Sequence, residues 1–227
     1  MSQQNNNKHW IPLESNPQVL SHYLHKLGVD ESVSIVDVLS PELLDLVPRP
    51  VYAVILLYPL KEKTAKESKL TVPDQVYFCK QTISNACGTV ALVHAVLNNM
   101  HRLVCKRDSF FDKFHRSTLH LSPDERATCL EQSAELDALH AEFAQEGQSQ
   151  APLENEEIDL HFVTFICQQE RLVLLDGRLE QPIVYGSCTE ENLLQEATNV
   201  IQQEFMAKDP NEVRFNILAV VKNDSVS

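Results

Sequence analysis

Glycine is scarce in this chain of 227 residues, which contains only five, and its six cysteines form no Cys-x-x-Cys pair. Few glycines disfavour long flexible linkers, so a single domain over residues 1–227 is expected, with residues 1–8 as a flexible polar tip. Scattered cysteines favour free thiols over disulfides or a zinc site. No signal peptide is recognisable at the start, and no apolar run approaches the ~18 residues of a membrane span. These absences predict a cytoplasmic or nuclear protein.

Basic residues are also few: the chain has 19 Lys and Arg and 32 Asp and Glu, which gives a net charge of −13. Such a charge repels nucleic acid and anionic membranes, so neither is expected as a partner. It would attract a basic protein or peptide, although solubility alone explains the composition equally well.

Hydrophobic patterning predicts helices joined to strands. Helices are expected over residues 14–29, 85–99, 121–145 and 189–210, and strands over residues 34–39, 51–60, 159–167, 171–177 and 213–222. Asn16 and Gly28 mark the start and end of the first helix, and Ser122 caps the third. The pattern indicates an α/β or α+β fold in which helices cover a mostly antiparallel sheet.

Cys87 stands where the helix of residues 85–99 is expected to begin, with Ser84 or Asn85 as the N-cap. Unpaired N–H groups and the positive end of a helix dipole favour a thiolate there, and Gly88 would leave room for a substrate backbone. A small buried cysteine that packs a helix start is the simpler interpretation unless catalytic partners exist.

A nucleophilic cysteine needs a base, and the base needs an orienting group. His161 opens one expected strand and Asp176 ends the next. A hairpin turn centred between Gln168 and Gln169 would place His161 directly opposite Asp176 on one face of the sheet. Two unrelated polar groups at strand ends are the alternative.

The other histidines are weaker candidates for the base. His94 follows Cys87 on the same helix but about 10 Å along its axis, so a core position is expected for it. The rest have no neighbour that marks them as catalytic; they include His22 and His25 on a surface-like helix, and His115 and His120 in irregular polar sequence.

Gln81 precedes Cys87 and could place its side-chain amide at a developing oxyanion, beside the backbone N–H of Cys87. A glutamine before a helix is common, so this residue alone predicts little. The order Gln81, Cys87, His161, Asp176 is what points to a cysteine hydrolase.

The stretches WIPLESNPQVL, VYFCKQTISNACGT, LSPDERA, EGQSQAP, DLHF, LLDGR and DPNEVRFNILAV follow one another almost end to end. In these stretches the chain resembles the ubiquitin C-terminal hydrolase family of cysteine proteases, in its short single-domain form. The resemblance implies that Cys87 is the nucleophile, His161 the general base and later acid, Asp176 the orienting carboxylate and Gln81 the oxyanion donor.

The resemblance also implies a papain-like α-β-α sandwich with a knotted backbone, no metal or organic cofactor, and a monomer. The implied reaction is hydrolysis, through a thioester acyl-enzyme, of small adducts or short extensions from the C-terminal glycine of ubiquitin. Preference for a ubiquitin-like modifier, sequestration of ubiquitin with little catalysis, and general papain-like peptidase activity stay open as alternatives.

Three segments are implied as contacts for ubiquitin. They comprise Pro12, Leu13, Glu14, Ser15, Asn16 and Pro17; Ala144, Gln145, Glu146, Gly147, Gln148, Ser149, Gln150 and Ala151; and Glu212, Val213, Arg214, Phe215, Asn216 and Ile217. Residues 144–157 would form a crossover loop above the active site and exclude bulky folded conjugates, or else a plain polar connector. Leu13 would contact ubiquitin or pack as a staple on the first helix. The role of residues 103–121 stays open.

Overall fold

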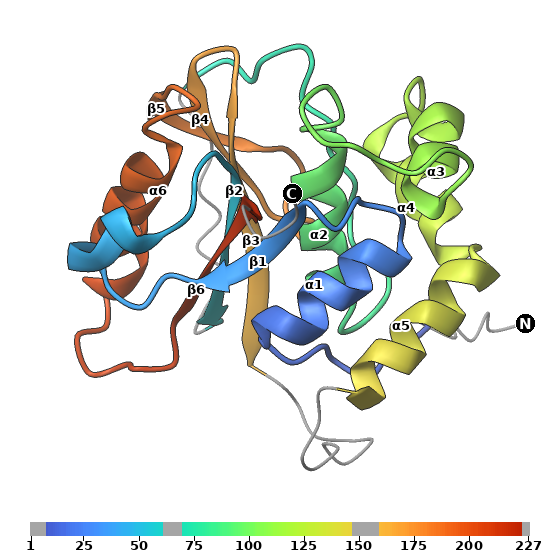
Figure 1. The fold of residues 1–227 in the computed structure, drawn as a ribbon, viewed down its shortest axis with the longest axis horizontal. Helices are drawn as coiled ribbons and strands as arrows, with labels where there is room; N and C mark the ends of the chain where they lie inside the picture. The colour runs from blue at the N-terminus through green and yellow to red at the C-terminus, as the bar shows by residue number, and fades with distance from the viewer. Residues whose placement is uncertain (1–7, 61–69, 147–158, 224–227) are drawn as a thin grey trace, which may run out of the picture.

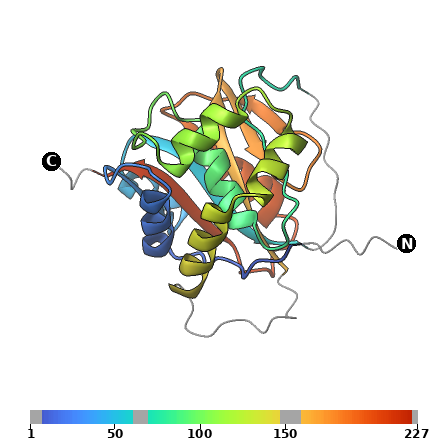
Figure 2. The ribbon, with the colours of Figure 1, turned by 90° about the vertical axis from the view of Figure 1, so that its right-hand side faces the viewer.

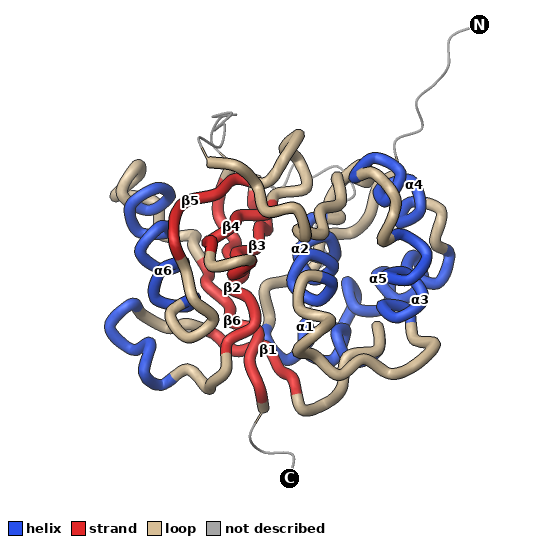
Figure 3. Tube along the Cα trace, turned by 90° about the horizontal axis from the view of Figure 1, so that it is seen from above, coloured by secondary structure: helices blue, strands red, loops and turns tan. Residues whose placement is uncertain are grey.

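A single six-stranded sheet forms the centre of the protein, and helices cover both of its faces (Figures 1 and 3). The structure, a computed structural model, describes residues 8–60, 70–146 and 159–223. The strands are β1 (Val33–Asp37), β2 (Val51–Pro59), β3 (Leu160–Gln168), β4 (Arg171–Leu175), β5 (Ile183–Ser187) and β6 (Asn216–Lys222). Their order is β1-β6-β2-β3-β4-β5, and each neighbouring pair is antiparallel. The predicted α-β-α sandwich with an antiparallel sheet is confirmed.

Two helical layers enclose this sheet. The helices are α1 (Pro17–Lys26), α2 (Cys87–Leu97), α3 (Phe110–Thr118), α4 (Pro123–Glu131), α5 (Ala134–Glu146) and α6 (Leu193–Ile201), with a 3₁₀ helix η1 (Pro41–Leu46) and a π-helical turn η2 (Gln202–Met206). Helices α1 to α5 lie on one side of the sheet, and α6 with η1 lies on the other (Figure 3). Figure 2 views the molecule from the side of α3, α4 and α5, with the sheet behind them.

The central strands are apolar on both faces because both faces are covered. Ile55 of β2 packs in the core on the α2 side, whereas its neighbours Val54 and Leu56 pack in the core on the α6 side. Each strand therefore contributes to two separate apolar clusters, as its continuous run of hydrophobic residues predicts.

Helix α2 lies at the centre of the larger helical layer, and all eleven of its residues are buried. The Thr164 hydroxyl of β3 donates a hydrogen bond to the Ala91 carbonyl of α2, at 2.9 Å. This contact fixes α2, which starts at Cys87, against β3, which carries His161 near its start.

The predicted ends of α1 are confirmed. The Asn16 side chain accepts hydrogen bonds from the backbone N–H groups of Gln18 and Val19, at 3.0 and 3.3 Å. Gly28 follows the helix with φ +114°, a conformation that glycine adopts at little cost.

The long helix expected over residues 121–145 is wrong, because the structure has two helices there. Ser122 and Glu125 form a capping box at the start of α4. A second serine, Ser133, then accepts a hydrogen bond from the Leu136 N–H at 3.2 Å and begins α5. A serine side chain readily accepts a hydrogen bond from the N–H groups at a helix start that have no partner within the helix. Ser133 therefore separates α4 from α5 and caps α5.

Helix α3 (Phe110–Thr118) lies within residues 103–121, the segment whose role stays open. Ser109 caps it, and Phe110, Phe111 and Phe114 are buried and pack toward α2. His115, which was expected in irregular sequence, lies on this helix.

Two of the described segments also differ from expectation at one end, the first at Lys8 and the second at residues 144–146. Lys8, which was expected to be flexible, donates hydrogen bonds to the Glu131 carbonyl at 2.6 Å and to Asp137 at 2.5 Å. Ala144, Gln145 and Glu146, which were expected in the crossover loop, form the last turn of α5. The rest of that loop lies outside the described residues. Within the described ranges, no helix is long and apolar enough to cross a membrane.

Candidate active site

Cys87 is the first residue of α2, as predicted, but its N-cap is Ala86 rather than Ser84 or Asn85. Asn85 has φ +62°, and its side-chain amide donates to the Trp10 carbonyl at 3.1 Å instead of capping the helix. The N–H of Cys87 belongs to the first helical turn and has no partner within the helix. The nucleophile candidate therefore carries a backbone donor at its own position.

The space that a side chain at Gly88 would occupy is filled by the chain itself, whereas the approach of a substrate backbone at this residue stays a prediction. A methyl group at Gly88 would lie 3.1 Å from Leu13 Cδ1 and 3.4 Å from the Phe162 ring. Leu13 is buried and packs at the start of α2, which explains why glycine is needed at this close approach.

His161 and Asp176 are brought together as predicted. His161 Nε2 and Asp176 Oδ1 are 2.7 Å apart, and both side chains are almost fully buried, at 3% and 9% exposure. Asp176 lies one residue after β4, and its Oδ1 also accepts a hydrogen bond from the Arg178 N–H at 2.9 Å. This second contact holds the carboxylate in place beside the imidazole.

The predicted hairpin register is wrong by two residues. The turn consists of Gln169 and Glu170, both with positive φ, so Thr164 pairs with Leu175 and His161 is not directly opposite Asp176. Because side chains alternate along a strand, a shift of two residues leaves both groups on the same face. The Asp176 carboxylate still reaches the imidazole for this reason.

The imidazole of His161 joins the carboxylate to the thiol. Its Nε2 contacts Asp176 Oδ1 at 2.7 Å, and Cys87 is close enough to interact with the same ring and raise its pKa. Burial alone would favour a neutral ring, but the hydrogen bonds with Asp176 and Cys87 outweigh burial and raise the pKa of His161 to about 9. Burial would likewise raise the pKa of Asp176, but the hydrogen bond with His161 and its positive charge lower it. At neutral pH the pair is therefore an imidazolium and a carboxylate.

Gln81 lies against the turn that carries Asp176. Its backbone N–H donates to the Gly177 carbonyl at 2.7 Å, and a Cβ at Gly177 would lie 3.0 Å from Gln81 Cβ. The side-chain Nε2 donates to the Ile83 carbonyl at 3.2 Å, which orients the amide. An amide nitrogen has two N–H groups, so one remains for an oxyanion. Gln81, Cys87, His161 and Asp176 are thus held by one connected group of contacts.

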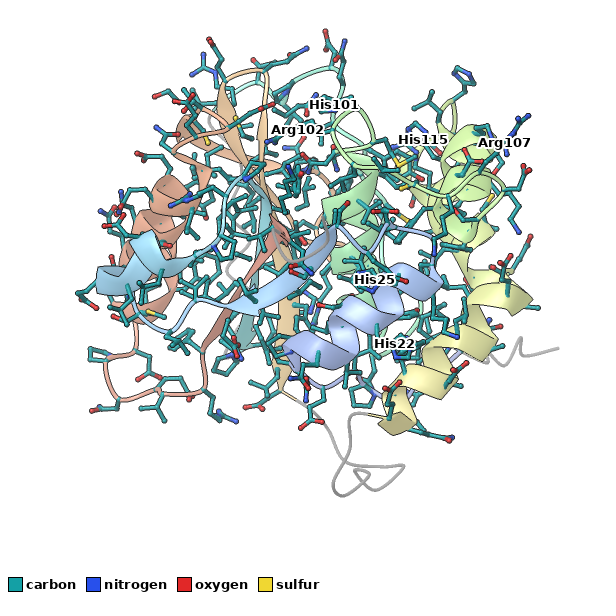
Figure 4. All side chains as sticks on the ribbon, viewed as in Figure 1. His22, His25, His101, Arg102, Arg107 and His115 are labelled. Carbon is teal, nitrogen blue, oxygen red and sulfur yellow. The ribbon has the colours of Figure 1, made fainter. Side chains whose placement is uncertain are left out.

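The remaining histidines do not compete for the role of base. Figure 4 shows His22 and His25 on α1 and His115 at α3. His94 is fully buried, as predicted for a core residue, and burial lowers its pKa to about 4. His140 is also buried, with its pKa lowered to about 4, and its two ring nitrogens contact Thr89 and the Ile11 carbonyl.

Comparison with known proteins agrees with this geometry. The family described as "Ubiquitin carboxyl-terminal hydrolase, family 1" matches residues 10–207. This chain belongs to that family. A ubiquitin carboxyl-terminal hydrolase of Aplysia californica is 45% identical, over 88% of this chain and 96% of the relative. The isozyme L1 of Rattus norvegicus is 39% identical, over 93% and 97% of the two chains.

Among solved structures of the family, the catalytic domain of UCH37 from Trichinella spiralis, bound to ubiquitin vinyl methyl ester, is similar. Its TM-score is 0.75 with 26% sequence identity, and the match covers 94% of this chain and 95% of that one.

Tyr58 is a neighbour of this hydrolase site that the sequence analysis missed. It pairs with His161 in the β2–β3 ladder, and the two rings meet edge to face with centroids 6.0 Å apart. Burial raises the pKa of Tyr58; the negative charge of Asp176 adds to this effect, and the positive charge of Arg178 opposes it. The antiparallel pairing of β2 with β3 would have indicated Tyr58, but hydrophobic periodicity alone does not predict which distant strands pair.

The implied ubiquitin contacts fall in different environments. Asn16 and Pro17 begin α1, and Val213 is 85% exposed in the loop before β6. Arg214 in that loop pairs with Asp159 and Glu212, both at 2.9 Å. Ile217, in contrast, is buried inside β6, so it packs the core rather than the surface. Gly147, Gln148, Ser149, Gln150 and Ala151 lie outside the described residues.

In the part of the chain that the structure describes, no group of three or more His, Cys, Asp or Glu side chains is arranged to hold a metal ion.

Proposed function

We propose that this protein is a cysteine-type deubiquitinating hydrolase that removes small adducts or short extensions from the C-terminal glycine of ubiquitin. The observation that carries the proposal is the buried unit in which Asp176 contacts His161 at 2.7 Å and Cys87 interacts with the same imidazole. Relatives named ubiquitin carboxyl-terminal hydrolase, and a similar structure bound to ubiquitin vinyl methyl ester, support the substrate class.

The reaction begins with attack of the Cys87 sulfur on the carbonyl carbon of the last glycine of ubiquitin. The negative charge that develops on the carbonyl oxygen is stabilised by the Gln81 amide and the Cys87 N–H. The His161 imidazolium then gives its proton to the leaving group, and a thioester remains. Neutral His161 next removes a proton from water, which hydrolyses the thioester and releases ubiquitin.

Asp176 orients the His161 ring during both formation and hydrolysis of the thioester. Its contact at Nε2 keeps Nδ1 toward Cys87, and its charge stabilises the imidazolium form. We place it in a positioning role because it touches the imidazole and not the reacting atoms.

The net charge of −13 supports a basic substrate. The tail of ubiquitin is basic and extended, so an acidic protein attracts it and favours its docking.

Two contacts place residues next to the implied ubiquitin-binding segments close together, and we take this as support for their assignment. His22 of α1, the helix that residues 12–17 lead into, lies 3.3 Å from Glu146 at the end of α5. Asp159, at the start of the next described segment, pairs with Arg214 at 2.9 Å. The described ends on either side of residues 147–158 thus lie beside the other two segments. Ubiquitin as the partner, a monomeric state and a cytoplasmic location complete the proposal.

The test is reaction of the full chain with ubiquitin vinyl methyl ester, followed by intact mass. We expect one adduct on the unaltered protein and none on Cys87→Ala, while Cys105→Ala serves as a matched control and labels fully. Tight binding of ubiquitin without labelling would overturn the proposal and favour sequestration. Hydrolysis of a ubiquitin amide faster than the amide of a ubiquitin-like modifier is the second expected result, and the reverse order would contradict the assigned substrate.

A further inference from the structure

Cys167 and Cys188 lie side by side, far from Cys87 along the sheet. Cys167 is near the end of β3, and Cys188 follows β5, so β4 separates the two strands in the sheet. The chain turns inward after β5, however, because the Cys188 N–H donates to the Glu170 carbonyl at 3.0 Å. This turn places Cys188 beside the β3–β4 hairpin, where Cys167 Sγ is 3.3 Å from the Cys188 carbonyl oxygen.

The two thiols are close enough to shift each other's pKa in opposite directions. Cys188 is 1% exposed, and its thiol contacts the Thr189 carbonyl at 3.3 Å, whereas Cys167 is half-buried and reachable from solvent. The half-buried Cys105, in contrast, contacts the sulfur of Met100 at 3.6 Å and is not beside a second thiol in these contacts.

The surroundings make the two thiols unequal. The hydrogen bond from Cys188 lowers the pKa of Cys167, whereas the same contact and burial raise the pKa of Cys188. Glu190 and Arg102 (Figure 4), which pair at 3.3 Å, act in opposite directions: the negative charge of Glu190 raises the pKa of Cys167, and the positive charge of Arg102 lowers it. A thiolate that solvent can reach is the form that reacts with oxidants.

We propose that Cys167 and Cys188 form a reversible disulfide when the protein meets a hydroperoxide, which makes this pair a redox-modification site separate from Cys87. The proposal is independent of the substrate of the hydrolase.

The chemistry balances with the peroxide as the only added reactant. The Cys167 thiolate attacks one peroxide oxygen, the O–O bond breaks, and Cys167 sulfenic acid and hydroxide form. The hydroxide takes up the proton that the Cys167 thiol released on ionising, which gives the first water. The Cys188 sulfur then attacks the sulfenic sulfur, the S–O bond breaks, and a second water leaves with the Cys188 proton. Two thiols are oxidised to one disulfide, and one hydrogen peroxide is reduced to two waters.

The crosslink would join residues 21 positions apart and close a loop that contains β4 and β5. Closing a loop of this length restricts the unfolded chain and stabilises the folded one. His161 lies at the opposite end of β3, and six residues of strand span about 20 Å. The crosslink is therefore expected to raise thermal stability without contacting the catalytic group.

The experiment uses the full chain carrying Cys87→Ala, so that peroxide does not consume the nucleophile. The protein is treated with hydrogen peroxide, free thiols are alkylated, and peptides are mapped without reduction. We expect a peptide pair linked through Cys167 and Cys188 with the loss of two hydrogens, which a dithiol reductant reverses. Oxidation should raise the Tm by at least about 5 °C.

Two further substitutions in the same background decide the outcome. Cys167→Ala replaces a half-buried side chain and should remove both the linked peptide and the rise in Tm, whereas Cys105→Ala should retain both. Sulfinic acid at Cys167 without a linked peptide would overturn the proposal. A link from Cys188 to any other cysteine, or an equal rise in Tm for oxidised Cys167→Ala, would overturn it as well.

Discussion

Replacing Asp176 by asparagine removes a charge from the catalytic unit while keeping the size of the side chain. The carboxylate lies 2.7 Å from His161 Nε2 in a site that excludes water, so nothing else screens or replaces the lost charge. Without it, burial is expected to bring the pKa of His161 down from about 9 toward its ordinary value of 6.5. The imidazolium that protonates the leaving group would then be scarce at the pH where the native enzyme works.

The size of the effect follows from these two values. At pH 8, a histidine with a pKa of 9 is about 90% protonated, and one with a pKa of 6.5 is about 3% protonated. Asp176→Asn should therefore lower kcat/KM at pH 8 by about 30-fold and have a much smaller effect near pH 6. The alkaline limb of the pH profile should move from about 9 toward 6.5.

The free energy of unfolding should also fall as the pH rises, because it depends on the protonation of His161. A histidine with a raised pKa stabilises the folded protein fully below its unfolded value, and this contribution is lost as the pH rises through about 9. The difference between 6.5 and about 9 corresponds to roughly 3 kcal/mol at most. Urea unfolding at pH 6 and pH 10 should show this loss in the native protein and much less of it in Asp176→Asn.

The assay is hydrolysis of a fluorogenic ubiquitin amide between pH 5 and 10, with Asp176→Glu as a matched variant that keeps the charge. An alkaline limb that stays near 9 in Asp176→Asn would refute the reasoning, because another group would then control the protonation of His161.

Three further predictions concern other parts of the molecule. Gln81→Ala should lower kcat by about 10²–10³ with little change in KM, and a pure KM effect in steady-state kinetics would remove it from the oxyanion site. Arg126→Met should destabilise the fold by about 3 kcal/mol or more in urea unfolding, because the buried guanidinium binds the carbonyls of Phe78, Thr118 and Leu119 at 2.9–3.1 Å. An unchanged midpoint would contradict that role. Di-ubiquitin should be cleaved far more slowly than a small ubiquitin amide, and comparable rates would disprove exclusion of folded conjugates.

The candidate site could be predicted from sequence because its chemistry depends on which residue types are present and on which face of the sheet each side chain lies. Cys87 at a helix start and His161 and Asp176 on successive strands are local features that periodicity reports well. The turn was predicted one residue too early, which shifts the pairing by two residues, since Gln169 and Glu170 adopt positive φ, which these residue types rarely do. A shift of two residues keeps His161 and Asp176 on the same face, so their predicted contact is still found.

The strand order and the packing of segments far apart in the sequence could not be predicted in the same way. Strand β6 is last in the chain yet lies between β1 and β2, and no local pattern encodes that position. Strand β5 is only five residues long and contains Gly186, so its signal is weak. The packing of Leu13 beside Gly88 likewise joins segments more than seventy positions apart, and glycine alone does not predict it.

The most direct measurement is a crystal structure of the full chain after reaction with ubiquitin vinyl methyl ester. The account predicts a covalent bond to Cys87 Sγ, His161 Nδ1 facing that sulfur with Asp176 at Nε2, and ubiquitin lying against residues 12–17 and 212–215. A bond to any other residue, or an imidazole turned away from both Cys87 and Asp176, would contradict it.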